Sequence, residues 1–196
     1  MIPLIYQPGL AMVALWVAFA VSWIAAMVWS DTAAQRLGFT RELPYRAVAI
    51  LGGVLFAIPA HGYIGPLRLW HVTLIEAWIC VGLIVAGFAF AWWARIHLGR
   101  LWSGTITAKA NHRVVDTGPY GIVRHPIYTG ILLAVYATML AKGTVPGVLG
   151  AVLITLALWM KARLEEGFLR EQLGAETYDG YRRRVPMLMP FGPKSA

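Results

Sequence analysis

The chain has 196 residues, of which 59% are hydrophobic and only 13% are charged, and its mean hydropathy is +0.63. Soluble domains carry about a quarter charged residues, so this composition excludes a disordered chain and argues against a soluble globular enzyme. The net charge is +8, but the 17 Lys and Arg residues fall between long apolar runs, which favours anionic lipid headgroups over nucleic acid as the partner.

Five apolar stretches are long enough, or nearly so, to cross a membrane as helices, each span needing roughly 20 residues. The expected spans are residues 10–29, 47–64, 72–94, 124–141 and 143–160. The first lacks the basic flank of a signal peptide and is therefore predicted to be a retained anchor. The fourth and fifth are joined by a Lys-Gly-Thr turn, which predicts a helical hairpin. The expected fold is all-α, a single polytopic membrane domain.

The basic residues between these spans alternate in number along the chain. Three, five and seven Lys or Arg residues fall in segments 30–46, 95–126 and 161–196, whereas segments 1–9, 65–71 and position 142 have none, one and one. Because cytoplasmic loops are enriched in Lys and Arg, this alternation predicts an N-terminus outside the cell and a cytoplasmic location for segments 95–126 and 161–192. Functional residues are therefore expected in these two segments.

Two details of the third span also carry expectations. Glu76 is an acid within an apolar run, and we expect it to pair with Arg68 or His71 near the outer surface. Gly82 and Gly87 are expected to allow close packing between helices.

The fourth span is preceded by the sequence Arg124-His125-Pro126. Proline suits the first position of a helix because it has no N–H to satisfy, and the residue before it is kept out of the helical conformation. We therefore expect a helix that begins at Pro126 with His125 near its N-cap. Such a helix start can bind an anionic group, with Arg124 and Tyr128 beside it. The alternative is a plain helix start whose arginine binds a lipid phosphate.

The segment after the fifth span is charged but keeps apolar residues at near-helical spacing, which predicts an amphipathic continuation on the cytoplasmic face. Glu165 and Glu166 are adjacent, so their side chains point about 100° apart and are not expected to act together on one substrate atom. One of them could face the Arg-His-Pro helix start and bind a ligand amine or hydroxyl. The alternative is a solvated helix in which Glu166 pairs with Arg170.

Together these two segments resemble the isoprenylcysteine carboxyl methyltransferase family of membrane enzymes. The matching motifs are His112-x-Val114-Val115, Gly118-x-Tyr120, Arg124-His125-Pro126-x-Tyr128-x-Gly130, Glu165-Glu166, Gly174, Tyr178, Tyr181, Arg184-Val185-Pro186 and Pro190. The chain lacks the Gly-x-Gly of the related phosphatidylethanolamine methyltransferases and has fewer expected spans than the eukaryotic prenylcysteine enzymes. It is more similar to the short prokaryotic members, and this resemblance implies a prokaryotic inner membrane.

The resemblance implies that the chain binds S-adenosyl-L-methionine and methylates a lipid-like, prenylated or small carboxylate acceptor taken from the membrane. The residues expected to bind the cofactor are His112, Arg113, Val114, Val115, Tyr120, His125, Pro126, Ile127, Tyr128, Glu165 and Glu166. The residues expected to have catalytic roles are Arg124, Lys161 and Arg163, of which Lys161 or Arg163 would lie near the acceptor carboxylate.

Methyl transfer from a sulfonium ion is an in-line displacement that neutralises charge, so it requires no metal and no covalent intermediate. The sequence has no cluster with metal-ligand spacing, and its one cysteine, Cys80, lies inside an apolar run. A carboxylate acceptor is already ionised, which leaves positioning and water exclusion to the protein. Trp102, Tyr120 and Tyr128 could offer aromatic faces to the adenine or to the sulfonium.

Other functions stay open at this point. The C-terminal halves of sterol reductases, which bind NADPH, have a similar Arg-His-x-x-Tyr-x-Gly stretch, although an acid commonly follows that glycine and this chain has Ile131 there. A phospholipid or thiol methyltransferase is a second alternative. A non-enzymatic membrane protein whose basic face binds anionic lipid is the third.

Overall fold

The computed structural model describes residues 6–29, 35–36, 38–60, 65–103, 107–108 and 114–194. Its elements are α1 (Gln7–Ala25), η2 (Ala26–Val28), β1 (Gln35–Arg36), α2 (Phe39–Ala57), η3 (Gly65–Leu67), α3 (Leu74–Leu98), η4 (Gly99–Leu101), β2 (Thr107–Ala108), α4 (Pro119–Ile122), α5 (Pro126–Lys142), α6 (Val145–Leu173) and α7 (Ala175–Arg184). The strands β1 and β2 pair antiparallel over two residues each, and the other elements are helical. The prediction of an all-α fold is confirmed.

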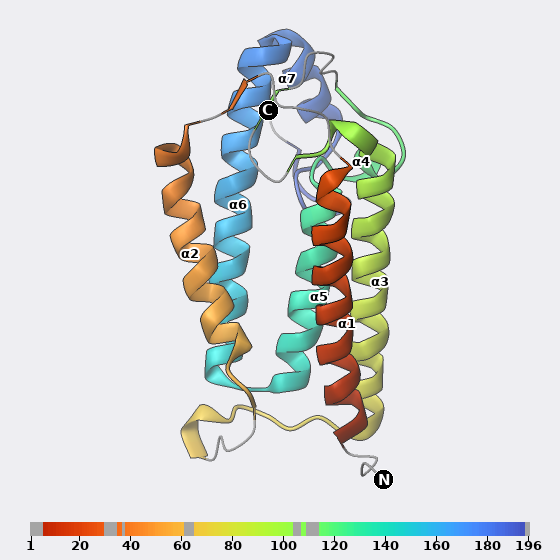
Figure 1. The fold of residues 1–196 in the computed structure, drawn as a ribbon, viewed down its shortest axis with the longest axis vertical. Helices are drawn as coiled ribbons and strands as arrows, with labels where there is room; N and C mark the ends of the chain where they lie inside the picture. Colours follow the sequence, from red (N-terminus) through yellow and green to blue (C-terminus); the bar gives the residue numbers. More distant parts are fainter. Residues whose placement is uncertain are drawn as a thin grey trace.

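Five of the described helices, α1, α2, α3, α5 and α6, run along the long axis of the molecule (Figure 1). α3 packs along α5, α2 packs along α6, and α1 lies against α3. α4 and α7 gather at one end of the bundle, where α5 begins and α6 ends. The opposite end holds the turn between α5 and α6 and the loop that precedes α3.

Glycines at facing positions allow the two helix pairs to approach closely. A Cβ atom on Gly87 of α3 would lie 2.5 Å from the carbonyl oxygen of Gly130 in α5. A Cβ on Gly150 of α6 would lie 2.8 Å from the carbonyl oxygen of Gly52 in α2. The packing role expected of Gly87 is therefore confirmed. The same expectation for Gly82 is wrong, because a Cβ there would meet nothing within 4 Å.

The predicted hairpin between α5 and α6 is present. Gly143 ends α5 in the left-handed conformation (φ 59°), and the Thr144 hydroxyl accepts a hydrogen bond from the Gly147 N–H at 3.3 Å to begin α6. The loop before α3 reinforces the turn, since the Leu69 N–H donates to the Gly143 carbonyl (2.8 Å) and the Trp70 indole N–H donates to the Leu140 carbonyl (2.7 Å). These hydrogen bonds fix the loop before α3 to the α5–α6 turn at this end of the bundle.

Three stretches of the described chain are long and apolar enough to cross a membrane, and α5 is apolar but has only 17 residues. The three stretches are Gln7–Val28, Leu74–Leu101 and Val145–Leu173. Together with the helical bundle, they make this an all-α membrane protein.

The span predicted at residues 47–64 overlaps the observed helix only in part, because α2 covers Phe39–Ala57. The helix ends early because Pro59 keeps the preceding residue extended. It begins early because its polar first turns are satisfied within the helix: Glu42 accepts hydrogen bonds from the Tyr45 hydroxyl (3.1 Å) and from Arg46 Nε (3.0 Å). The other predicted spans differ from the observed helices mainly at their ends.

The expectation that Glu76 pairs with Arg68 or His71 is also wrong. Its carboxylate caps the start of α3, accepting hydrogen bonds from the Thr73 N–H (2.7 Å) and hydroxyl (2.9 Å). The Thr73 hydroxyl in turn accepts from the Glu76 N–H, which completes a capping box. Arg68 donates instead to backbone carbonyls of residues 60 and 70.

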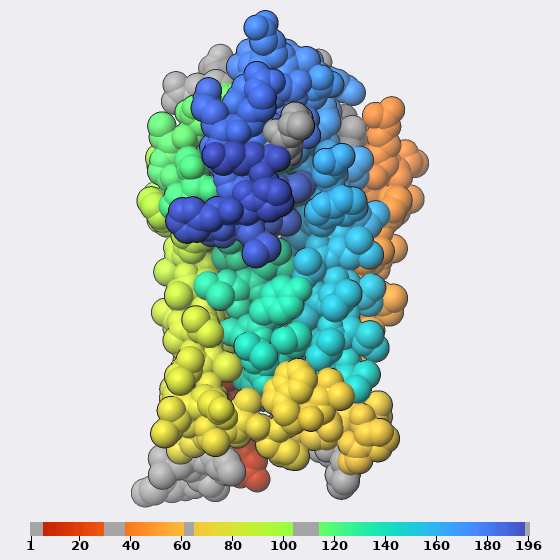
Figure 2. Space-filling view, turned by 180° about the vertical axis from the view of Figure 1, so that it is seen from behind, coloured from red at the N-terminus to blue at the C-terminus, as the bar shows by residue number. Residues whose placement is uncertain are grey.

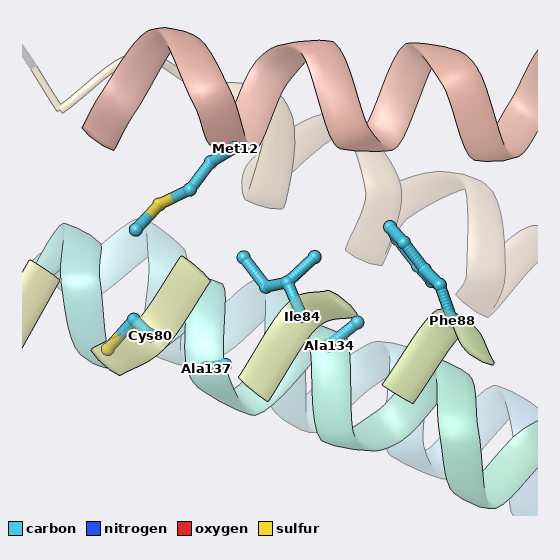
Figure 3. Close-up of a cluster of buried hydrophobic side chains, with 6 residues drawn as sticks. All are labelled: Met12, Cys80, Ile84, Phe88, Ala134 and Ala137. Atoms are coloured by element: carbon cyan, nitrogen blue, oxygen red, sulfur yellow. The ribbon is translucent and has the colours of Figure 1, made fainter. Parts of the chain in front are cut away.

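A cluster of apolar side chains joins α1, α3 and α5 in the half of the bundle away from α7 (Figure 3). Its buried members are Met12, Cys80, Ile84, Phe88, Ala134 and Ala137. Beside it, the indole N–H of Trp16 donates to the hydroxyl of Thr138 at 3.0 Å. This core fixes α1 on the α3–α5 pair.

We predict that replacing Gly87 with Ala lowers the stability of the bundle by about 1–3 kcal/mol, because the added methyl meets backbone that must move apart. The matched control is Gly82→Ala on the same helix, where the methyl enters open space. Thermal unfolding of both variants in detergent measures the difference. Equal midpoints for the two variants would contradict the close packing of α3 on α5.

Candidate functional site

A cavity of about 380 Å³ lies at the end of the bundle that carries α4 and α7. Its walls come from α1, from the end of α3 and the residues after it, from the start of α5, from α6 and from α7. Most of the lining side chains are apolar or aromatic. The charged or ionisable exceptions apart from tyrosine are Arg124, His125, Lys161 and Glu165.

The Arg124-His125-Pro126 sequence begins α5 as predicted. Pro126 takes the first helical position, and His125 is the N-cap residue with a non-helical backbone (φ −124°, ψ 63°). The backbone N–H groups of Arg124 and His125 donate to the carbonyls of Pro186 (2.8 Å) and Met187 (3.1 Å). Figure 2 shows the C-terminal segment lying across this end of α5. The helix start therefore holds the segment that follows α7.

The Arg124 side chain extends the same attachment. Its guanidinium donates to Glu166 Oε1 at 2.7 Å and to the carbonyl oxygens of Arg182 (3.0 Å) and Val185 (2.6 Å). Arg124 is 4% exposed, so these contacts are made away from bulk water. The charge of Arg124 therefore neutralises Glu166 and fixes the C-terminal segment, and its catalytic role stays a prediction.

Glu165 and Glu166 point in different directions, as their adjacent positions predict. Glu165 lines the cavity, and both of its oxygens lie 2.8 Å from the Tyr128 hydroxyl. Lys161 Nζ lies 3.9 Å from Glu165 Oε1, one helical turn earlier. Glu166 is buried against Arg124 instead and is not part of the cavity wall. Glu165 therefore faces the cavity, whereas Glu166 neutralises the buried Arg124.

The suggested pairing of Glu166 with Arg170 is wrong. Arg170 pairs with Asp179 of α7 at 2.9 Å, and the Arg182 Nη1 atom lies 3.2 Å from the same carboxylate. Hydrogen bonding from the Arg170 guanidinium holds the pKa of Asp179 below its usual value. Arg182 Nε also lies 3.5 Å from Glu166, so these charges fasten α7 onto the end of α6.

The imidazole of His125 lies between the two glutamates. Its Nε2 atom is 3.2 Å from Glu166 Oε1, and its Nδ1 atom is 3.6 Å from Glu165 Oε2. The ring stacks in parallel on Tyr128, with centroids 5.3 Å apart and an interplanar angle of 3°. The ring orientation is therefore fixed from three sides.

An aromatic wall faces these polar groups. Trp102 meets Trp23 of α1 edge to face, with centroids 5.6 Å apart, and Tyr120 lies in the same buried cluster as Trp102. The Tyr120 carbonyl accepts a hydrogen bond from the Tyr181 hydroxyl at 2.7 Å. Burial raises the pKa of the Tyr120 side chain, which keeps its hydroxyl protonated. The three predicted aromatic residues, Trp102, Tyr120 and Tyr128, all line the cavity.

Arg95, which the sequence did not single out, supports this wall from behind. Its guanidinium carbon lies 4.3 Å from the Trp102 ring centre, and the side chain is fully buried. It donates to the carbonyls of Gly99 (2.7 Å), Ala26 (2.9 Å) and Trp29 (2.9 Å). It therefore ties the ends of α1 and α3 together beside the cavity. An arginine inside a strongly apolar run was the only sequence signal for this role.

The remaining predicted residues are placed as follows. Val114, Val115, Pro126 and Ile127 line the cavity. Arg163 does not, since its side chain is exposed and lies over the ring of Trp159, 6.0 Å from its centre. The predictions for His112 and Arg113 fall outside the described residues. Within the described part of the chain, no group of three or more His, Cys, Asp or Glu side chains could hold a metal ion.

The cavity also has walls that the sequence motifs did not indicate. Trp23 comes from α1, Met27 comes from η2, and Tyr178 and Tyr181 come from α7. The motif positions of Tyr178 and Tyr181 carried the resemblance, but only the placement of α7 shows that they face the cavity.

Comparison with known proteins gives a family match over this region. The family model described as phospholipid methyltransferase matches residues 75–176, just over half of the 196 residues. The matched part begins in α3 and ends in the first turn of α7, so it contains the helix start at Pro126 and both glutamates.

Individual relatives cover a similar region. A methanethiol S-methyltransferase 2 of Bradyrhizobium diazoefficiens is 32% identical over 136 residues, covering 64% of this chain and 51% of that protein. A protein-S-isoprenylcysteine O-methyltransferase of Schizosaccharomyces pombe is 29% identical over 129 residues, covering 63% of this chain and 51% of that protein. A methanethiol S-methyltransferase of Crocosphaera subtropica is 40% identical over 77 residues, or 39% and 29% of the two chains. The chain thus spans about half the length of the first two relatives.

We predict that Glu166→Gln destabilises the protein by about 3 kcal/mol or more, because it leaves the buried Arg124 charge without its counter-ion. Glu171→Gln, an exposed change on the same helix, serves as the control and should have little effect. Thermal unfolding in detergent compares the two variants with the wild-type chain. An unchanged midpoint for Glu166→Gln would show that the ion pair does not hold the C-terminal segment.

Proposed function

We propose that this chain, which belongs to the phospholipid methyltransferase family, transfers a methyl group from S-adenosyl-L-methionine to an acceptor at the membrane. The observation that carries the proposal is the meeting of Tyr128 and Glu165 in the cavity wall, 37 residues apart in the chain and in hydrogen-bond contact. The names of the relatives support the reaction class, since each is called a methyltransferase.

The cavity suits the proposed methyl donor. Its volume of about 380 Å³ lies within the range of roughly 300–1,000 Å³ that is typical of small-ligand sites. Trp102 and Tyr120 offer ring faces for the adenine, and Glu165 can accept hydrogen bonds from the ammonium or ribose hydroxyls. The helix start at Pro126 offers a positive dipole end to the donor carboxylate. Val114 and Val115 line the same cavity, while the predictions for His112 and Arg113 lie outside the described residues.

When bound, S-adenosyl-L-methionine supplies an electrophilic methyl group on a sulfonium cation. Glu165 places a negative charge in a largely apolar wall, where it attracts a cation more strongly than it would in water. Tyr128 fixes this carboxylate through its hydroxyl group. Tyr178 and Tyr181 of α7 form part of the wall and help to exclude water. The contribution of the chain is the alignment of donor and acceptor.

The proposed acceptor is lipid-like or small and apolar. The names of the relatives refer to a small thiol, methanethiol, and to a prenylated cysteine. Trp23 of α1 and Met27 of η2 extend the apolar wall towards the N-terminal helix, whose other faces are largely exposed. A membrane-dissolved acceptor can therefore approach along this helix. Lys161 lines the cavity and can hold an acceptor carboxylate. Arg163 does not line it, and a catalytic role for that residue stays a prediction.

We also propose that the five long helices each cross the membrane, with the cavity at the cytoplasmic surface. Support comes from the alternating directions of the helices, which bring the basic segments 30–46, 95–126 and 161–196 to the same end (Figure 1). Arg183 and Arg184 are exposed at that end and would contact anionic headgroups. A prokaryotic inner membrane is the proposed location.

We predict that S-adenosylhomocysteine, the demethylated product, stabilises the purified protein, by about 2.7 kcal/mol at a ligand concentration 100 times its Kd. Glu165→Gln should lose most of this stabilisation because the variant lacks the charge that faces the cavity. Thermal shift in detergent measures both effects, with Glu171→Gln as the control that should behave like the wild-type chain.

The same measurement with NADPH separates the alternative function. Stabilisation by NADPH and not by S-adenosylhomocysteine would replace the proposed methyl transfer with a reductase-like reaction. Stabilisation by neither compound would favour a non-enzymatic lipid-binding protein.

A further inference from the structure

We propose that His125 acts as the proton acceptor of the reaction, and that the acceptor molecule is a neutral apolar thiol rather than a carboxylate. This inference rests on the proposed methyl transfer and specifies its substrate class. It starts from the position of the His125 ring between two carboxylates, one of which lines the cavity while the other does not.

The Glu166 contact sets the tautomer of His125. Glu166 is paired with Arg124 at 2.7 Å, so it is ionised and can only accept hydrogen bonds. The His125 Nε2 atom, 3.2 Å from Glu166 Oε1, must then carry a proton. In the neutral ring this leaves the lone pair on Nδ1. A carboxylate orients a catalytic histidine in the same way in the Ser-His-Asp arrangement.

The Nδ1 atom is the one on the cavity side. It lies 3.6 Å from Oε2 of Glu165, which lines the cavity, and this distance is too long for a hydrogen bond. The lone pair of His125 Nδ1 therefore faces a lone pair of Glu165 Oε2, and a proton can be held between these two atoms. A thiol proton can therefore be accepted at Nδ1, on the side of the ring that faces Glu165.

Several charged groups lie around the His125 ring. The two carboxylates of α6 face it from opposite sides, and the Tyr128 ring lies parallel to it. Lys161 is 3.9 Å from Glu165, and Arg182 of α7 is 3.5 Å from Glu166. The ionisable or charged groups that surround His125 are thus Arg124, Tyr128, Lys161, Glu165, Glu166 and Arg182.

The proposed step balances as follows. The thiol sulfur attacks the methyl carbon of the donor, a sulfur–carbon bond forms, and the carbon–sulfonium bond breaks. The electron pair of the broken bond stays on the donor sulfur, which becomes a neutral thioether. The thiol proton moves to His125 Nδ1 and is later released to water.

The presence of such a base discriminates between the two acceptor classes. An acceptor carboxylate is already ionised at neutral pH and has no proton to give. An alkyl thiol is mostly protonated there, because thiols ionise near pH 8.5 or above. The charge of Lys161 is also opposed by Glu165 one turn away, which weakens its attraction for a carboxylate acceptor. The largely apolar lining then suits a thiol without charge.

The test compares His125→Gln with the wild-type chain on two thiols, butanethiol and 4-nitrothiophenol, the second of which is ionised at neutral pH. His71→Gln is the matched control, since His71 is exposed at the opposite end of the bundle. In His125→Gln we expect kcat/KM for butanethiol to fall about 100-fold or more, while kcat/KM for 4-nitrothiophenol changes little. Stabilisation by S-adenosylhomocysteine should be kept.

The pH profile supplies an independent readout. In the wild-type chain, kcat/KM for butanethiol should not follow the fraction of thiolate in solution, because the protein takes the thiol proton. In His125→Gln it should instead rise in proportion to the thiolate present. Should the variant fail to fold, the wild-type chain is assayed with a series of thiols of graded acidity. A weak dependence of kcat/KM on thiol acidity supports a protein base. A kcat/KM proportional to the thiolate concentration overturns the inference.

Four other outcomes would overturn the inference. Equal losses for both thiols, or lost binding of S-adenosylhomocysteine in His125→Gln, would assign the residue to donor binding. Methylation of a prenylated cysteine carboxylate but of no thiol would end the inference while leaving the proposed methyl transfer intact. Absence of S-adenosylhomocysteine binding by the wild-type chain would end both.

Discussion

The buried ion pair between Arg124 and Glu166 is the contact on which the arrangement of the site depends. The guanidinium joins the start of α5, the C-terminal part of α6 and the carbonyls of residues 182 and 185, so three elements that are distant in the chain meet at one side chain. Glu166 is thereby turned away from the cavity, which leaves its neighbour Glu165 to face it. The same carboxylate orients His125. Removal of either partner would leave a buried charge uncompensated.

The bundle provides the frame in which this contact forms. Glycine contacts hold α3 on α5 and α2 on α6 over much of their length, and the turn at Gly143 closes the far end. At the near end the helices carry large aromatic and charged side chains, and the cavity lies among them. The membrane-embedded part therefore serves as a rigid support, while the chemistry is assigned to residues at its end.

The sequence predicted those features that depend on local chemistry. Pro126 could only begin a helix, and the adjacent glutamates had to diverge, so both expectations hold. α2 begins earlier than the predicted span because hydropathy ignores an internally paired Glu42. The ion pair of Arg124 was not predicted, because its partners lie 42 and about 60 residues away and no local pattern indicates them. Arg95 was missed because its acceptors are backbone carbonyls, which every sequence contains.

The most direct measurement of the central claim is an experimental structure of the detergent- or lipid-embedded protein with S-adenosylhomocysteine. The account predicts ligand density in the cavity, in contact with Glu165 and Tyr128 and against the Trp102 wall, with the Arg124–Glu166 pair intact. Density at another place, or Tyr128 and Glu165 too far apart to touch one ligand, would contradict it.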